Sequence, residues 1–83
     1  MRILYFSWLK EKIGLNFQEI IKPKSVETVD DLITFLIETS EKHKNAFSDL
    51  NSIKVAVNQE FAGLETKIKE KDEIAFFPPV TGG

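Results

Sequence analysis

Residues 28–37 read Thr28-Val-Asp-Asp-Leu-Ile-Thr-Phe-Leu-Ile37 and carry the clearest structural signal in the chain. Their large apolar side chains recur three and four residues apart, which places one stripe on an α-helix: Val29, Leu32, Ile33, Leu36 and Ile37. Thr28 stands just before this stripe and Asp31 follows three residues later, which resembles the capping box that begins many helices. The sequence therefore predicts one main amphipathic helix, and such a helix can cover one face of a sheet.

The segment after this helix is polar. Residues 41–44 read Glu-Lys-His-Lys, which predicts a solvated last turn followed by a loop through Asn51. His43 is the only histidine, and we expect it to be a solvated surface residue there. With one histidine and no cysteine, the chain cannot build a disulfide, a thiolate zinc site or a cysteine nucleophile. A histidine-rich metal site is excluded as well, so no metal site is predicted.

Apolar runs typical of strands precede the main helix. Residues 3–6 form a short apolar run, and residues 15–21 are rich in side chains that favour strands. Residues 8–13, between the two runs, predict a short helix, with Ser7 as its N-cap and Gly14 at its end. Two strands joined through a short helix are therefore expected before the main helix.

Strand patterns also follow the main helix. Residues 53–58 alternate large apolar with polar or small side chains, and residues 60–62 predict a brief return strand. Residues 73–77 predict a last strand, which Pro78 and Pro79 end because proline cannot donate to a strand ladder. The predicted fold class is α+β, a sheet of four or five strands with one main helix packed on one face.

Alternation along the strands assigns their side chains to the two faces of the sheet. The side chains expected to face the helix are Ile3, Tyr5, Val55, Val57, Ile74 and Phe76. Those expected to point away are Arg2, Leu4, Phe6, Lys54, Ala56, Asn58, Glu73, Ala75 and Phe77. The outward set is charged at one end and apolar at the other, where Phe6 and Phe77 lie and Phe61 could join them. An exposed apolar patch on a small domain predicts an interface.

Length and charge exclude several classes of protein. Eighty-three residues correspond to one small domain. A formal charge of −2 argues against a nucleic-acid binder, which needs a clustered positive face. No run of about 18 apolar residues is present, so no membrane span is expected. The first residues lack the features of a secretion signal, which favours a cytoplasmic protein.

The end of the chain is suited to being a substrate. Residues 72–83 read Asp72-Glu-Ile-Ala-Phe-Phe-Pro-Pro-Val-Thr-Gly-Gly83. The prolines favour an extended exit from the last strand, and residues 78–83 could reach about 20 Å. Glycines leave the tip without side chains, so it could thread a narrow pocket and present its carboxylate. A carboxylate must be activated before acyl transfer, and the chain has no Gly-rich phosphate loop, so activation is expected from a partner.

The segment Phe76-Phe-Pro-Pro-Val-Thr-Gly-Gly83, together with the order of elements, resembles the small, sulfur-carrier subunit of molybdopterin synthase. That subunit belongs to the MoaD/ThiS family of ubiquitin-like proteins. Val57-Asn58-Gln59 and the short helix ending at Gly14 occupy similar places in the family. The resemblance implies a β-grasp, ubiquitin-like fold for residues 1–77, with the first and last strands parallel in a mixed sheet. Residues 78–83 would form an extended, flexible tail.

The resemblance also implies a reaction cycle. An E1-like enzyme would use Mg-ATP to adenylate Gly83, and a sulfur-donating protein would convert the adenylate to a thiocarboxylate. The tail would enter the large synthase subunit, in a heterotetramer, and donate sulfur to cyclic pyranopterin monophosphate. Gly82 would allow passage of the tail, and the chain itself would bind no cofactor. The residues expected to contact partners are Phe6, Phe61, Phe77, Pro78, Pro79, Val80 and Thr81.

Two alternatives share the same tail chemistry. One is a sulfur carrier for thiamin synthesis or tRNA thiolation, with a different acceptor. The other is a ubiquitin-like modifier that is joined to lysines through Gly83. The Phe-Phe-Pro-Pro segment favours molybdopterin synthase, because the related carriers lack it.

Overall fold

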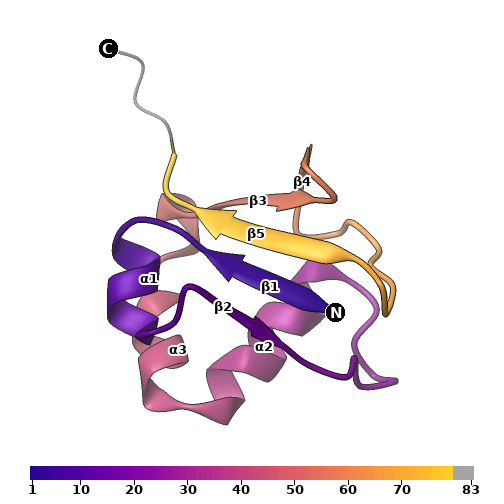
Figure 1. The fold of residues 1–83 in the computed structure, drawn as a ribbon, viewed down its shortest axis with the longest axis horizontal. Coiled ribbons are helices and arrows are strands. Elements are labelled where there is room, and N and C mark those ends of the chain that lie inside the picture. The colour runs from indigo at the N-terminus through magenta and orange to yellow at the C-terminus, as the bar shows by residue number, and fades with distance from the viewer. Residues whose placement is uncertain (80–83) are drawn as a thin grey trace.

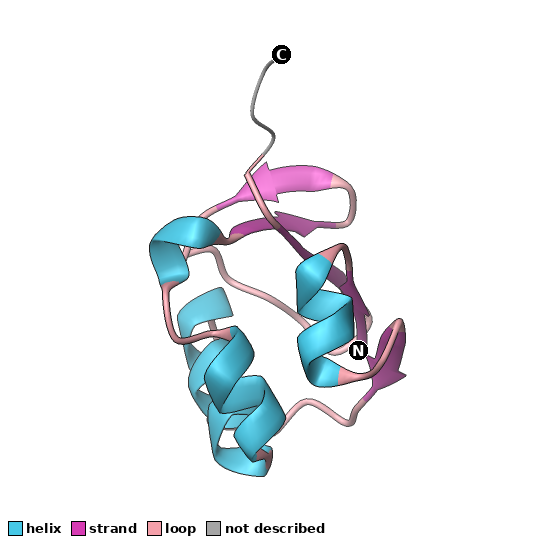
Figure 2. Ribbon diagram, turned by 90° about the vertical axis from the view of Figure 1, so that its left-hand side faces the viewer, coloured by secondary structure: helices cyan, strands magenta, loops and turns pink. Residues whose placement is uncertain are grey.

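The computed structural model of the chain describes residues 1–79 and contains one five-stranded sheet with helices against one face (Figures 1 and 2). Its elements are, in chain order, β1 (Arg2–Tyr5), α1 (Trp8–Ile13), β2 (Phe17–Glu19), α2 (Val29–Thr39), α3 (Glu41–Ala46), the 3-10 helix η1 (Leu50–Ser52), β3 (Lys54–Val57), β4 (Glu60–Ala62) and β5 (Glu73–Phe77). None of the helices described here is long and apolar enough to cross a bilayer.

The strands lie in the order β2-β1-β5-β3-β4, so the first and last strands of the chain are neighbours at the centre. β1 and β5 run parallel, and all other neighbouring pairs are antiparallel. In Figure 1 the indigo β1 and the yellow β5 point the same way across the middle of the sheet. This topology is the β-grasp arrangement, and the predicted mixed sheet with one main helix on one face is confirmed.

The capping box predicted at the start of α2 is present. The Asp31 N–H donates to Thr28 Oγ1 at 3.2 Å, and the Thr28 N–H donates to the Asp31 carboxylate at 3.2 Å. The Glu27 N–H donates to the same carboxylate at 3.0 Å. This bond is the largest cause of the lowered pKa of Asp31, and the hydrogen bonds from Thr28 add to it. The buried stripe of α2 consists of Val29, Leu32, Ile33 and Leu36. Each such side chain contributes about 1.5–3 kcal/mol of burial free energy.

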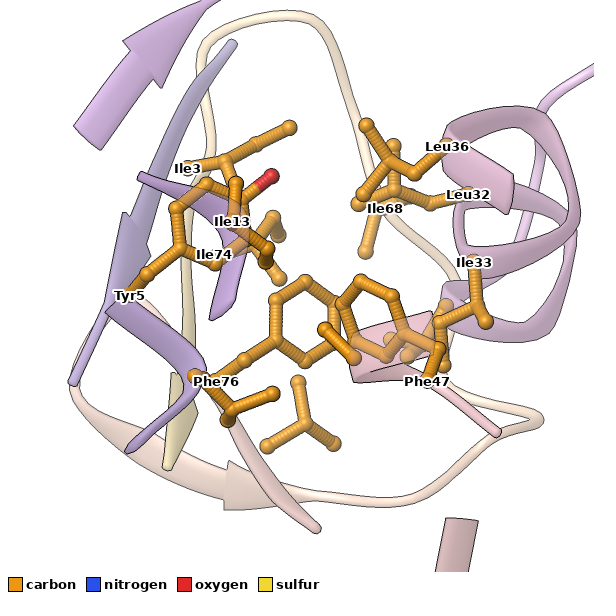
Figure 3. Packing of buried hydrophobic residues seen from close by; sticks show 14 of the residues in the cluster. Ile3, Tyr5, Ile13, Leu32, Ile33, Leu36, Phe47, Ile68, Ile74 and Phe76 are labelled. Carbon is orange, nitrogen blue, oxygen red and sulfur yellow. The ribbon is translucent and has the colours of Figure 1, made fainter. Parts of the chain in front are cut away.

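Phe76 of β5 lies at the centre of the core. Its ring stacks on that of Tyr5 at 6.3 Å between centroids and meets the edge of Phe47 at 5.0 Å. Figure 3 shows these side chains between the sheet and the helical layer. Of the six strand residues predicted to face the helix, five are buried and Val57 is half-buried. The alternation of side chains along the strands therefore predicted correctly which face of the sheet packs in the core.

The prediction for His43 is wrong, because this side chain is 6% exposed and lies inside the protein. The segment predicted as a last turn and loop forms α3 and, further on, η1. Ser40 caps α3 by accepting the His43 N–H at 3.1 Å. His43, Ala46 and Phe47 stand three and four residues apart, and together they form the buried face of this helix. The polar residues between them hid that pattern in the sequence.

His43 belongs to a buried network of hydrogen bonds that joins α3 to β1 and β2. The Tyr5 hydroxyl donates to Gln18 Oε1 at 2.6 Å, and His43 Nε2 lies 2.8 Å from the same oxygen. Ser40 Oγ lies 2.6 Å from His43 Nδ1. A neutral imidazole with its proton on Nε2 satisfies all these atoms, with the Ser40 hydroxyl donating to Nδ1. Burial raises the pKa of the Tyr5 phenol and lowers the pKa of His43.

We therefore expect the free energy of unfolding to fall when the pH is lowered from 7.5 to 5. The unfolded chain takes up a proton on His43 near pH 6.5, whereas the folded chain resists this until its lowered pKa is reached. The slope cannot exceed about 1.4 kcal/mol per pH unit, which is the limit for one titrating group. Urea unfolding at several pH values measures it. Because His43 is the only histidine, the His43→Gln variant should lose this slope, and an unchanged slope would contradict the assignment.

The β3–β4 hairpin turns through Asn58 and Gln59, which both have positive φ angles, of 51° and 71°. These angles are typical of a type I′ turn, in which glycine is the favoured second residue. The Gln59→Gly substitution should therefore raise the free energy of unfolding by about 0.5–1 kcal/mol. Thermal or urea unfolding measures the gain. A Gln59→Ala control, which keeps the strain, should show none, and equal effects of the two substitutions would argue against strain at this position.

Two smaller predictions about the first half of the chain are corrected. The strand predicted at residues 15–21 is shorter, since β2 covers only Phe17–Glu19, although the Tyr5 N–H still donates to the Asn16 carbonyl next to it. Gly14 ends α1 in the left-handed conformation as predicted, with φ at 84°. Ser7 occupies the N-cap position but makes no capping hydrogen bond, because its backbone at φ 56° and ψ −135° is not extended.

Candidate functional site

The candidate site lies at the edge of the sheet where β1 and β5 both end. Because these strands are parallel, their carboxyl ends meet, and the Phe6 N–H donates to the Phe76 carbonyl at 3.1 Å. β5 then continues into Pro78 and Pro79, which are half-buried. The buried ring of Phe76 fixes the last strand in the core immediately before this exit.

Phe61 and Phe77 form an aromatic pair beside this exit. Their ring centroids are 6.0 Å apart and the ring planes are inclined by 50°. Phe61 is 85% exposed, although it is a large apolar side chain on a regular strand. The two rings border a groove of about 370 Å³, the Phe61–Phe77 groove, which is lined by Lys54, Val55, Phe61, Ala62 and Phe77. Such a groove can accept an apolar side chain of a partner.

Phe6, the third phenylalanine predicted at this surface, is 48% exposed. It directly follows β1, and its backbone is bonded to β5 beside Phe77. Its ring is not part of the Phe61–Phe77 pair. The structure therefore brings two of the three predicted rings into contact and places the third at the end of the neighbouring strand.

The face of the sheet opposite the helices, the open face, carries an apolar row that crosses all five strands. The registers of neighbouring strands join its members in the order Phe17, Leu4, Ala75, Ala56 and Phe61. Ala56 points outward as predicted but is only 9% exposed, and its small side chain lies in register between Ala75 and the large ring of Phe61. Sequence reasoning did not assign a partner contact to Leu4 or Phe17. The register of β1 with β2 places Phe17 beside Leu4 and so in line with Phe61, and no local sequence pattern specifies this register.

Charges lie on either side of this row. At the end remote from the site, Arg2 is in register with Glu19 and Glu73, and its guanidinium lies 4.7 Å from the ring centroid of Phe17. At the end near the site, Lys54 is in register with Phe77. The open face is therefore charged at one end and largely apolar at the other, as the alternation predicted.

The reactive end of the predicted tail lies outside the described residues. Val80, Thr81, Gly82 and Gly83 remain predictions from the sequence. Within residues 1–79, no three histidine, aspartate or glutamate side chains are grouped to hold a metal ion. That the chain binds no cofactor of its own stays a prediction.

This chain is similar to known proteins along its whole length. The model of the ThiS family matches residues 3–83. A molybdopterin synthase sulfur carrier subunit from Haemophilus influenzae is 34% identical over 83 residues, with 100% of this chain and 99% of that protein covered. The structure of H. volcanii small archaeal modifier protein 1 matches with a TM-score of 0.75 and 27% identity, covering 96% of this chain and 97% of that one.

A solved complex is also similar. It contains subunits 1 and 2 of the molybdopterin-converting factor from Helicobacter pylori 26695, and the match has a TM-score of 0.60 and 26% identity. The alignment covers 99% of this chain and 96% of the matched chain. Full-length matches to these structures confirm the predicted ubiquitin-like fold.

Proposed function

The chain belongs to the ThiS family, and from that premise we propose that it is the sulfur-carrier small subunit of a molybdopterin synthase. One observation carries the proposal most directly. The Phe61–Phe77 pair, in which Phe61 is exposed and Phe77 half-buried, lies at the same edge of the sheet from which β5 leads into Pro78 and Pro79. A partner that covers this pair would also receive the tail that follows. The Haemophilus influenzae relative, named for this role, supports the same conclusion.

In the proposed cycle, an adenylating enzyme joins the Gly83 carboxylate to AMP from Mg-ATP and releases pyrophosphate. A donor that delivers sulfur at the oxidation level of sulfide then attacks the acyl adenylate, expels AMP and leaves a thiocarboxylate on Gly83. The large synthase subunit covers the Phe61–Phe77 groove and takes the tail into its active site. There each thiocarboxylate bonds through its sulfur to the pterin substrate, and water cleaves the acyl–sulfur bond, which leaves the sulfur on the substrate and returns Gly83 to a carboxylate. Two successive chains supply the two sulfur atoms of the dithiolene in this way. ATP is abundant in the cytoplasm, where we place the cycle.

In this cycle, the described residues act by binding and positioning rather than by chemistry. The core around Phe76 holds β5 rigid, so that the tail begins at a fixed point relative to Phe61 and Phe77. Fixing the root of the tail reduces the entropy lost when its tip enters a partner's active site. The chain is therefore a substrate and docking subunit of a sulfurtransferase, not an enzyme by itself.

Reconstitution from purified components tests this function. The chain, an adenylating enzyme, Mg-ATP, a sulfur donor, the large subunit and cyclic pyranopterin monophosphate should together form molybdopterin. Omission of the chain, of ATP or of the large subunit should each abolish the product. Product that forms equally well without the chain would contradict the proposal.

A second candidate is a protein modifier, which the likeness to the small archaeal modifier protein favours. In that case Gly83 would form isopeptide bonds with lysines of other proteins. Tryptic digests of cell extract would then contain lysines that carry residues 72–83 of this chain as a branch, because Lys71 is the last residue at which trypsin cleaves it. Their absence from cells that make molybdopterin would favour the sulfur carrier. A carrier for thiamin or tRNA thiolation would instead restore those products, and not molybdopterin, to a strain that lacks the chain.

A further inference from the structure

Lys54 is the charged residue that the open face places among its aromatic side chains. It is exposed, lies in register with Phe77 and lines the Phe61–Phe77 groove. The other basic strand residue of this face, Arg2, has Glu19 and Glu73 as register neighbours. Lys54 has no such neighbour, and within the described part of the chain it makes no ion pair. Its positive charge is therefore unmatched at the most apolar end of the face.

Covering the groove would change the surroundings of this charge. A partner that contacts Phe61 and Phe77 removes water from the adjacent ammonium group, because Lys54 lines the same groove. An ammonium group that loses water without gaining a counter-charge is strongly unfavourable. A well-fitted partner must therefore supply both an apolar group for the groove and an acceptor for the Lys54 cation.

We propose that Lys54 determines which partner surface can dock on this face. The surface that fits places an apolar side chain in the Phe61–Phe77 groove and an aspartate or glutamate carboxylate against Lys54 Nζ. This inference rests on the proposed function, since it gives the chemistry of the surface that the large synthase subunit presents. A surface with a basic residue at that point is rejected, because like charges at an interface weaken association strongly.

Charge reversal in the full chain tests the inference. The dissociation constant for the purified large subunit is measured by titration calorimetry for the wild type, Lys54→Gln, Lys54→Glu and Lys44→Glu. Lys44 is exposed on α3, on the helical side of the protein, so Lys44→Glu changes the net charge equally without touching the groove. Lys54→Glu should bind at least about tenfold more weakly, Lys54→Gln about threefold, and Lys44→Glu within about twofold of wild type.

Two further measurements make the test specific: the dependence of binding on salt, and the exchange of charges between the two proteins. The difference between wild type and Lys54→Glu should shrink from 50 to 300 mM salt, because salt screens repulsion between charges. Changing acidic surface residues of the large subunit to lysine, one at a time, should yield one variant that restores binding to Lys54→Glu. If Lys54→Glu and Lys44→Glu bind alike, the inference is wrong while the proposed function stands. If the wild-type chain does not bind the large subunit, both fail.

Discussion

Removal of Gly82 and Gly83 should abolish sulfur transfer and leave the fold intact. The proposed reaction takes place on the Gly83 carboxylate, so its loss removes the reacting group itself, and we expect a decrease of at least about 1000-fold. The core does not depend on these residues, since the last buried side chain of the described chain is Phe76. Molybdopterin formed in the reconstituted reaction and the midpoint of thermal unfolding measure the two effects.

A chain extended by one serine after Gly83 is a matched control for the truncation. It keeps every docking residue but moves the carboxylate one residue further on, so it should bind the large subunit and yield no molybdopterin. Binding by this control separates failure of the chemistry from failure of docking. Normal molybdopterin formation by the truncated chain would contradict the assignment of Gly83 as the sulfur carrier.

The Phe76→Ala substitution should cost about 3–5 kcal/mol of unfolding free energy, as expected for loss of a large core side chain. Phe76 is fully buried and contacts the rings of Tyr5 and Phe47. Small domains are stable by only about 5–15 kcal/mol, so this variant should be partly or largely unfolded at 37 °C. Urea unfolding followed by circular dichroism measures the loss.

Phe77→Ala, one residue further along β5, is the control for this prediction. Phe77 is half-buried and faces the open side of the sheet, where it pairs with Phe61. Its removal should cost about 1 kcal/mol of stability and weaken binding of the large subunit by about tenfold or more. Equal losses of stability in the two variants would contradict the division of β5 into a core face and a docking face.

The elements that the sequence predicts well are those with a local physical signature. The stripe and capping box of α2 lie within a few residues of one another, and both are present. Alternation placed Tyr5 and Phe76 in the core and Phe77 on the open face, because side chains in a strand point alternately to the two sides. Gly14 ends α1 because only the left-handed conformation, which glycine adopts readily, makes that turn.

The features that were missed depend on contacts between distant segments. His43 lies in a run of polar residues, and its burial depends on hydrogen bonds to Tyr5 and Gln18, which are far from it in the sequence. Phe17 joins the apolar row only through the register of β2 with β1. Phe61 joins Phe77 as expected, but the position of β3 between β4 and β5, which brings the two rings together, is not specified by the order of strands in the sequence. Such contacts arise from the tertiary arrangement and leave no local pattern.

The mass of the C-terminal peptide tests the central claim most directly. The purified chain is incubated with an adenylating enzyme, Mg-ATP and a sulfur donor, without the large subunit, so that the product accumulates. Exchange of one oxygen for sulfur adds about 16 Da, the same nominal shift as sulfoxide formation at Met1, so the mass is measured on the C-terminal peptide, which lacks Met1, and fragmentation assigns the shift to Gly83. We predict that shift on Gly83, dependent on ATP. An unmodified Gly83 after ATP has been consumed by the adenylating enzyme would contradict the assignment of the chain as a sulfur carrier.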